Sequence, residues 1–580
     1  MRCALIISIL LAAASLAPAQ DFYPLSEVRA GQQGVGRTVF QGTEIEEFGV
    51  EVLGVLENVG PKQSLIIVRL SGEQIAKTGV MSGMSGSPVY IDGRLAGAIA
   101  FSFPFATDPL AGVRPIADMT AAASTERAAL DGSAAMLALQ GRGETLLPHE
   151  PVSRSADALT AIATPVSFGG FSPRTLDIFG DQLRALGLRP MQGIGGGQVD
   201  MDASPIEPGS MITVGLIRGD MNVNAAGTVT HVDGERVYAF GHPFLSSGPA
   251  RLPMMRSSVL ASVASLQNSF KLAGSGGVVG SIDFDRSTGV IGTLGESPEL
   301  TPFRIRMDSE GTELAYDLEI VDDPAITPFL VQMASFSAID ATERQVGALT
   351  VRFEGQAELK GLPPLSLNGL YAGPSTVGQI AALNMAATLG FVMQAGPDSP
   401  ELESIDLKIS VRQQDRRASI VRAWAEKERI KPGETLQLNA VVRLPDGTEK
   451  LEHISWQAPF STAPGPLQVT LSDGSALNML DLPLLFEASR LNTARVVESL
   501  NSLRQADQLY LRVWRPQRGL RVETARLSSP PASLRAILDT PRGAAGGASP
   551  EASTTLHEAV VASYDAVIEG QQTIEVTISE

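Results

Sequence analysis

Residues 82–100 read SGMSGSPVYIDGRLAGAIA. Two apolar arms in this stretch flank Asp92 and Gly93, a dipeptide that accepts positive φ at both positions of a two-residue β-turn. The stretch therefore predicts a β-hairpin over residues 89–101, preceded by a tight turn rich in Gly and Ser.

Similar signals extend in both directions from this hairpin. Short apolar or alternating runs fill residues 30–100 and continue from Met211, and a second Asp-Gly turn stands at Asp233 and Gly234. The 57 Gly and 37 Pro punctuate short segments throughout, which favours many strands and turns over long helices. We expect a mainly β fold. Residues 375–395 are the exception, because they are apolar with a helical pattern, and their internal Gln and Asn favour a buried core helix over a membrane span.

The turn before the first hairpin also indicates chemistry. Gly83 and Gly86 let the backbone turn sharply so that the hydroxyl of Ser85 projects, and the N–H groups of Gly83 and Ser85 then converge as an oxyanion hole. A chymotrypsin-like serine peptidase needs this arrangement. The structural alternative is a tight Gly/Ser turn between two strands, because short motifs often arise by chance.

A nucleophilic serine needs a base, and the sequence contains five histidines: His149, His231, His242, His453 and His557. His242 ends an apolar strand between Gly241 and Pro243, where a base can face a cleft. The other four lie on a hairpin strand, in a linker or in later segments, so they need no catalytic role.

Three segments resemble the SpoIVB family of serine peptidases, the stage IV sporulation proteases. KTGVMSGMSGSPVYIDGRLAGAIAF (77–101) is similar to the family's Ser-bearing segment. GLIRGDMNVNAAGTVTHVDGERVYAFGHPF (215–244) resembles its His-bearing segment, and SGGVVGSIDFDRSTGVIGTLGE (275–296) resembles the Gly-rich segment that follows the His. The resemblance implies that Ser85 is the nucleophile and His242 the general base.

The chain departs from the family pattern in two respects. The Ser segment precedes the His segment here, whereas the family has the reverse order, although triad geometry is independent of chain order. The family also has an Asp before the Ser motif. The matching position lies close to Ser71, and Glu73 is displaced from it.

Asp220 is the candidate for the missing acid. If Asp233 and Gly234 form the turn, Val232 pairs with Glu235, and the register places Ala225 opposite His242. The loop with Asp220 would then border the imidazole. The alternative role for Asp220 is to cap a turn through its side chain.

The expected fold is mainly β: a chymotrypsin-like double β-barrel core with a C-terminal immunoglobulin-like β-sandwich and an additional α/β C-terminal segment. The expected divisions are a signal peptide (1–19), a Ser-bearing half (20–125), a helical segment and linker (126–190), a His-bearing half (191–330), a β segment with a buried helix (331–412), the sandwich (413–490) and the C-terminal segment (491–580).

The N-terminus and the charge bear on location and partners. Residues 1–19 have the basic, apolar and small-x-small regions of a cleaved signal peptide, with a non-cleaved anchor as the alternative. They contain Cys3, the only cysteine. A secreted or periplasmic location follows, without thiol chemistry or disulfides. The net charge of −18 disfavours nucleic acid, and no motif indicates a metal or another cofactor. A protein or peptide substrate and a cell-envelope protein partner are the expected partners.

Two functions remain open. The first is a secreted serine endopeptidase that cleaves envelope or extracellular proteins through a Ser-His acyl-enzyme mechanism. The second is a non-catalytic envelope scaffold or peptide-binding protein that retains the peptidase fold.

Overall fold

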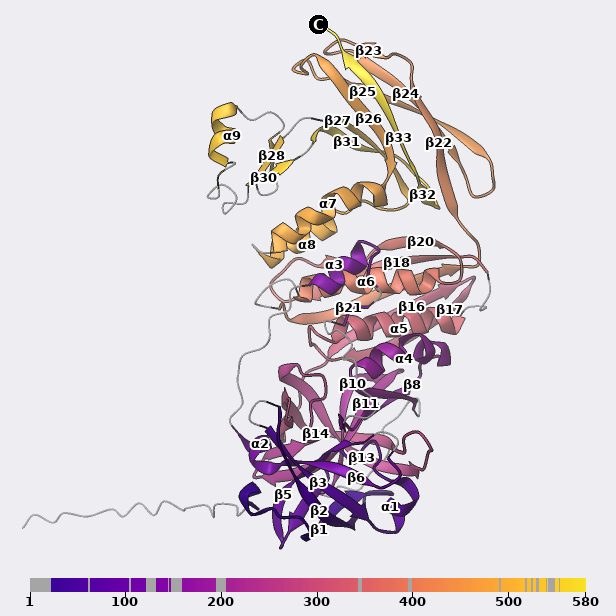
Figure 1. Cartoon of the computed structure of the whole chain (residues 1–580). Helices are drawn as coiled ribbons and strands as arrows, with labels where there is room; N and C mark the ends of the chain where they lie inside the picture. The colour runs from indigo at the N-terminus through magenta and orange to yellow at the C-terminus, as the bar shows by residue number, and fades with distance from the viewer. Residues whose placement is uncertain are drawn as a thin grey trace, which may run out of the picture.

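The computed structural model is mainly β, with 51% strand and 19% helix. Figure 1 shows two β-barrels at one end, a layer of helices and sheet beside them, and a β-sandwich at the other end. The predicted signal peptide lies outside the described residues, and so do parts of the linker and of the C-terminal segment. The structure describes residues 22–60, 63–103, 106–121, 132–143, 145–147, 159–193, 205–342, 347–394, 399–489, 492–516, 519–522, 525–527, 531–538, 540, 548–551 and 553–580.

The first barrel, called the Ser barrel here, spans residues 33–115. Its six strands follow the order β4-β1-β2-β3-β6-β5, and pairing of β4 with β5 closes the ring. The predicted hairpin is confirmed as β4 and β5, with Asp92 at φ 50° and Gly93 at φ 76° in the turn. The elements are η1 (Leu25–Glu27), β1 (Gln33–Val39), β2 (Ile45–Gly60), β3 (Gln63–Ser71), α1 (Glu73–Thr78), β4 (Pro88–Ile91), β5 (Arg94–Ser102), β6 (Leu110–Pro115) and α2 (Ile116–Thr120), and β7 (Thr160–Ala161) extends the sheet beside β5.

The second barrel, called the His barrel here, spans residues 211–294. Its strands follow the order β10-β13-β14-β15-β12-β11, and pairing of β10 with β11 closes this ring as well. The expected double-barrel core is therefore present. The strands are β10 (Met211–Gly219), β11 (Asn222–Asp233), β12 (Arg236–Ala239), β13 (Gly248–Val263), β14 (Phe270–Arg286) and β15 (Gly289–Leu294).

The register predicted for the β11–β12 hairpin is wrong. Asp233 pairs with Arg236, so the two-residue turn is Gly234 and Glu235, and a β-bulge between Val229 and His231 shifts the pairs further. A bulge adds one residue to one strand, which changes every later pair. Ala225 pairs with β10 and β8, and does not lie opposite His242 in the sheet.

The sheet of the His barrel continues into a helical layer. From β10 it runs through β17, β16, β21 and β18, and α4, α5 and α6 pack beside it (Figure 1). The predicted buried helix is confirmed as α6. Among the described residues, this helix is long and apolar enough to span a bilayer, but 72% of it is buried in the fold. The elements are α3 (Ser133–Leu139), β8 (Thr164–Gly169), α4 (Pro173–Ala185), β9 (Leu188–Gln192), β16 (Thr301–Ser309), β17 (Thr312–Ile320), α5 (Thr327–Thr342), β18 (Leu349–Leu359), β19 (Leu365–Ser366), β20 (Gly369–Gly373), α6 (Val377–Gln394) and β21 (Leu402–Arg412).

The C-terminal region is a β-sandwich with two sheets, ordered β25-β24-β22-β32 and β23-β33-β26-β27-β31, around one apolar core. Strands from 508 to 578 complete it, beyond the range expected from sequence, and its immunoglobulin-like character stays a prediction. The elements are β22 (Arg417–Ala425), β23 (Arg429–Ile430), β24 (Thr435–Arg443), β25 (Glu449–Gln457), β26 (Gly465–Asp473), α7 (Gly474–Ser489), α8 (Thr493–Asn501), β27 (Gln508–Arg515), β28 (Gly519–Val522), β29 (Ala525–Leu527), α9 (Ala532–Leu538), β30 (Ala548–Glu551), β31 (Thr554–Ser563), β32 (Val567–Glu569) and β33 (Gln571–Ile578).

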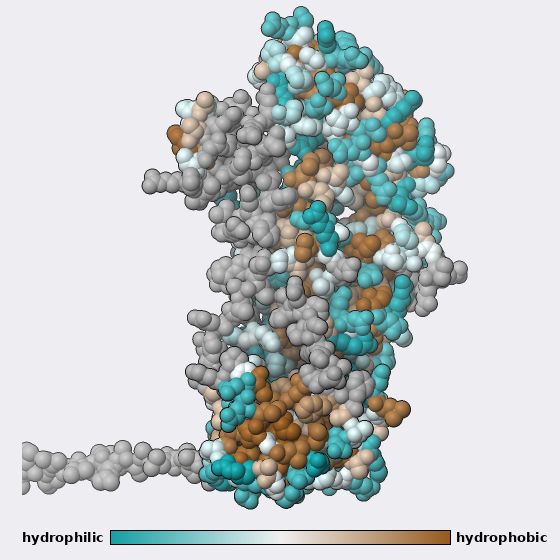
Figure 2. All heavy atoms as spheres, viewed as in Figure 1, coloured by the Kyte–Doolittle hydropathy of each residue, from teal (hydrophilic) through white to brown (hydrophobic). Residues whose placement is uncertain are grey.

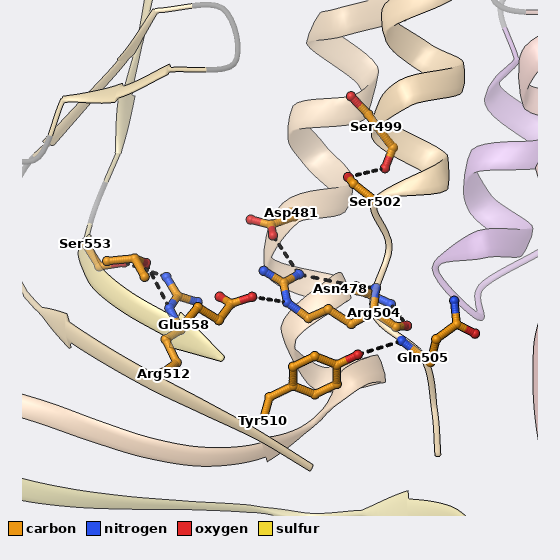
Figure 3. A network of polar contacts seen from close by, with 11 residues as sticks. Asn478, Asp481, Ser499, Ser502, Arg504, Gln505, Tyr510, Arg512, Ser553 and Glu558 are labelled. Atoms are coloured by element: carbon orange, nitrogen blue, oxygen red, sulfur yellow. Dashed lines mark hydrogen bonds and ion pairs between the residues drawn. The ribbon is translucent and has the colours of Figure 1, made fainter. Parts of the chain in front are cut away.

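A polar network ties α7 and α8 to the sandwich (Figure 3). Arg504 follows α8 and pairs with Glu558 of β31 at 2.6 Å and with Asp481 of α7 at 2.8 Å. Asn478 of α7 bonds both backbone groups of Arg504. At the end of α8, Asn501 bonds to the β19 region of the helical layer. The two helices therefore join the sandwich to the rest of the molecule.

Candidate active site

Ser85 lies in the turn between α1 and β4, as the sequence predicts. Gly83 and Gly86 both have φ of 96°, in the left-handed region that glycine accepts without strain. The Ser85 side chain is fully buried, and its Oγ has no hydrogen-bond partner among the described residues. Within the described residues, the N–H groups of Gly83 and Ser85 donate to no protein acceptor. An oxyanion hole needs two backbone donors of this kind.

The turn docks onto the His barrel through Thr228 of β11. The Thr228 N–H donates to the Ser85 carbonyl at 2.9 Å, and its hydroxyl donates to the Gly83 carbonyl at 2.9 Å. Thr230 donates to the Gly86 carbonyl at 2.7 Å. A Cβ on Gly86 would overlap the Thr228 carbonyl oxygen and lie 2.6 Å from the Phe240 nitrogen. The absence of a side chain at Gly86 thus permits the contact between the barrels.

His242 follows β12 at the same junction. Phe240 and Gly241 have φ of 69° and 70°, so the chain turns out of the sheet just before the histidine. A non-glycine residue in this region is strained, and such strain persists where the surroundings hold it. The Phe240 N–H donates to the Thr228 carbonyl at 3.2 Å, so Thr228 is bonded to the segments of both predicted catalytic residues.

Strand β5 also contacts both segments. The Gly86 N–H donates to the Ile99 carbonyl at 2.7 Å, while a Cβ on Gly241 would lie 3.0 Å from the Ala100 Cβ. From β6, the buried Arg114 directs its guanidinium to the Gly241 carbonyl at 3.5 Å. The fold therefore brings the Ser85 turn and the His242 segment to one buried junction between the two barrels.

The imidazole of His242 is itself buried, with 2% exposure. Its Nδ1 lies 2.8 Å from the carbonyl oxygen of Pro243. After Pro243 the chain forms a loop whose backbone N–H groups point at the carboxylate of Asp285, at the end of β14. Sequence reasoning noted the segment with Asp285 but assigned the residue no role.

The predicted acid, Asp220, lies in the turn between β10 and β11. Its carboxylate accepts the N–H of Asp317 of β17 at 2.8 Å in an exposed setting. This bond links the turn to β17, so it is not the local turn cap weighed as the alternative. A catalytic role for Asp220 stays a prediction, although the β11–β12 register from which it was inferred is wrong. Glu73, the other acid near the family position, is exposed on α1 and pairs with Lys77.

The remaining histidines in the described residues have other environments. His231 lies edge-on to Phe22 and stacks on Tyr238, and burial lowers its pKa while Asp233 partly opposes that shift. His453 contacts Asn439, and His557 lies beside Trp456. His149 is outside the described residues.

Lys271 was missed by sequence reasoning. It is fully buried on β14, and its amine donates to the Thr38 hydroxyl at 2.6 Å. Ser87 donates to the same hydroxyl. A Cβ on Gly83 would lie 3.3 Å from the Cβ and Cδ of the Lys271 side chain. Burial lowers the pKa of Lys271 to about 7. The amine thus lies under the turn that presents Ser85.

Metal binding finds no support in this geometry. Within the described ranges, no three or more His, Cys, Asp or Glu side chains are grouped so that they could hold an ion. The expectation that the chain needs no cofactor stays a prediction.

Comparison with known proteins agrees with the Ser-bearing half of this site. Residues 20–116 match the family model described as SpoIVB peptidase S55. No curated protein and no solved structure matches the chain significantly. The matched residues include the entire Ser barrel and the Ser85 turn. The part of the chain that contains the Ser barrel is thus similar to the SpoIVB peptidase family.

Proposed function

We propose that the protein is a secreted or periplasmic serine endopeptidase that cleaves envelope or extracellular proteins. The observation that carries the proposal is the junction at Thr228, where the Ser85 turn and the segment before His242 are hydrogen-bonded to one residue. A peptidase domain of this family implies a protein substrate. The signal-peptide pattern of residues 1–19 supports the location.

The proposed mechanism uses an acyl-enzyme. Ser85 Oγ attacks the scissile carbonyl carbon while His242 Nε2 takes its proton, and the N–H groups of Gly83 and Ser85 stabilise the oxyanion. The imidazolium then protonates the leaving amine, and the acyl group stays on Ser85 as an ester. In the second half His242 takes a proton from water, the water oxygen attacks the ester carbonyl, and the imidazolium returns a proton to Ser85 Oγ. Ser85 is fully buried, so substrate entry requires a movement of the segments that cover it.

A fluorophosphonate probe tests the proposal, because it labels an activated serine and ignores an ordinary one. We expect labelling of the purified protein that Ser85→Ala and His242→Ala abolish. The matched controls are Ser87→Ala, which removes a second buried serine of the same turn, and His231→Ala, which removes a histidine of the same barrel. Labelling that survives Ser85→Ala, or its absence in the folded wild type, would contradict the proposal.

The surface supports the second candidate, a non-catalytic scaffold that binds a partner protein. Figure 2 shows apolar residues gathered on one face of the barrel end. The barrel pair exposes Leu56, Leu260 and Leu266, with Leu266 fully exposed, and exposed apolar patches mark interaction sites. If the folded wild type is not labelled, this function is the one that remains.

A further inference from the structure

The loop after His242 is held by one buried carboxylate. Asp285 is 1% exposed. Its Oδ1 accepts the N–H of Phe244 at 2.8 Å, and its Oδ2 accepts those of Leu245 at 2.5 Å and Ser247 at 3.3 Å. Bonds from several backbone N–H groups to a carboxylate are charge-assisted and strong. They fix a loop that contains a strained residue, Ser246 at φ 58°.

The contact between His242 and Pro243 indicates the tautomer of the imidazole. A carbonyl oxygen only accepts hydrogen bonds, so the 2.8 Å approach of Nδ1 to the Pro243 oxygen requires a proton on Nδ1. In a neutral imidazole the lone pair is then on Nε2. This tautomer is the one that a general base needs in order to accept a serine proton, and in serine peptidases an aspartate normally enforces it.

The two sets of contacts share one peptide group. The C=O of Pro243 and the N–H of Phe244 belong to the same planar unit and point to opposite sides of it. Asp285 holds the N–H edge while the imidazole donates to the C=O edge. Because the unit is rigid, the carboxylate fixes the direction of the carbonyl, and hydrogen bonds in such a chain polarise and strengthen one another.

We propose that Asp285 is the positioning acid of this site, acting on His242 through the Pro243–Phe244 peptide group instead of by direct contact. It would thereby replace the family-position acid that the sequence lacks near Ser71. The inference rests on the proposed function, but it concerns a tautomer that is measurable whether or not the protein is active.

Two further observations support the assignment. Burial raises the pKa of Asp285, and the N–H groups of the loop oppose that rise, so the contacts to the loop are what favour its ionised form in a buried place. Asp220, the competing acid, is exposed and bonded to Asp317. Of these two carboxylates, Asp285 is the one bonded to the segment that follows the histidine.

The first experiment determines the tautomer directly. Protein labelled with ¹⁵N-histidine is examined by long-range ¹H–¹⁵N correlation at a pH where the imidazole is neutral, and His242 is assigned by loss of its signals in His242→Ala. We expect the pattern of the tautomer with the proton on Nδ1. The opposite tautomer in the wild type would overturn the inference.

The second experiment compares Asp285→Asn with Asp283→Asn. Asp283 lies two residues away on the same strand, and its carboxylate accepts a hydroxyl of Thr293 at 2.7 Å. Asp285→Asn keeps the shape but turns an amide N–H₂ toward a backbone donor. We expect it to yield a mixture of tautomers at His242 and to slow probe labelling of Ser85 by about 10- to 100-fold, the loss that removal of a hydrogen-bond partner causes at metal-bound histidines.

The variants also separate the possible failures. Asp283→Asn should keep the wild-type tautomer and labelling rate. If Asp285→Asn matches Asp283→Asn in both measurements, Asp285 has no positioning role. If Asp285→Asn does not fold, Asp285→Ser, which leaves room for water at the N–H groups, takes its place. If the wild type is not labelled at all, the proposed function fails, while the tautomers still decide the role of Asp285.

Discussion

The backbone N–H of Thr228 donates to the carbonyl oxygen of Ser85 at 2.9 Å, across the junction of the two barrels. The Ser85 turn is therefore shaped by a strand of the other barrel as well as by its own glycines. Three testable consequences follow from residues at this junction, beside the experiments on Ser85 and Asp285 described above.

Thr228→Val should slow probe labelling of Ser85 by about tenfold and reduce the free energy of unfolding by about 1 to 2 kcal/mol. The substitution keeps the shape but removes the hydroxyl that donates to the Gly83 carbonyl, so a buried acceptor loses its partner next to the predicted oxyanion hole. Labelling kinetics and chemical denaturation measure the two effects. Thr213→Val is the control, because that hydroxyl bonds within the His barrel. Equal effects of both variants on labelling would contradict a role for Thr228 in shaping the turn.

Gly86→Ala should be far more damaging than Gly93→Ala, although both glycines have positive φ. A Cβ on Gly86 meets the backbone of Thr228 and Phe240, whereas a Cβ on Gly93 meets nothing within 4 Å. We expect a loss of about 3 kcal/mol or more for the first and about 1 kcal/mol for the second, which carries only the conformational cost. Thermal unfolding of the two variants measures the difference, and similar melting temperatures would show that the barrels separate easily at this point.

Lys271→Met should remove a pH dependence of stability. Burial lowers the pKa of the folded-state amine to about 7 from its ordinary value of 10.5, so between these values the unfolded chain binds a proton that the folded chain does not. The free energy of unfolding of the wild type, relative to Lys271→Met, must therefore rise with pH across this window, by about 1.4 kcal/mol per unit at most, and stay at its lowest below pH 7.

Denaturation of both proteins at several pH values measures this slope. The surface variant Lys77→Met is the control, since Lys77 is exposed beside Glu73, and it should show no such slope relative to the wild type. A flat difference between the wild type and Lys271→Met would mean that the buried amine keeps its proton in the folded state.

The local parts of the fold were predictable because their causes are local. Asp92 and Gly93 specify a hairpin turn wherever the flanking residues are apolar, and the structure has that hairpin. Closure of the barrels depends on pairs far apart in sequence, such as Gly34 with Ile91, which no short pattern encodes. The predicted register of the second hairpin was wrong because a bulge leaves no clear signal in alternating apolar residues.

The residues of the candidate site also differ in whether their signals are local or depend on long-range contacts. Ser85 and His242 could be named as candidates because a glycine turn and a strand end mark them and because their segments resemble one peptidase family; their catalytic roles stay predictions. Asp285 could not be identified from the sequence, because nothing around it indicates that its carboxylate accepts the N–H of Phe244, 41 residues earlier. Thr228 stood within a recognisable segment, but its bonds to the Ser85 turn depend on how two separate barrels dock.

The distance in sequence between Gly83 and Thr228, 145 residues, also fixes the order of events during synthesis. The turn with the proposed nucleophile leaves the ribosome long before the strand that shapes it and before the proposed base. A nascent or truncated chain that ends before β11 has neither Thr228 nor His242, so it lacks the proposed base and the strand that docks onto the Ser85 turn. If the protein has the proposed activity, hydrolysis therefore becomes possible only after the second barrel has been made and has docked onto the first.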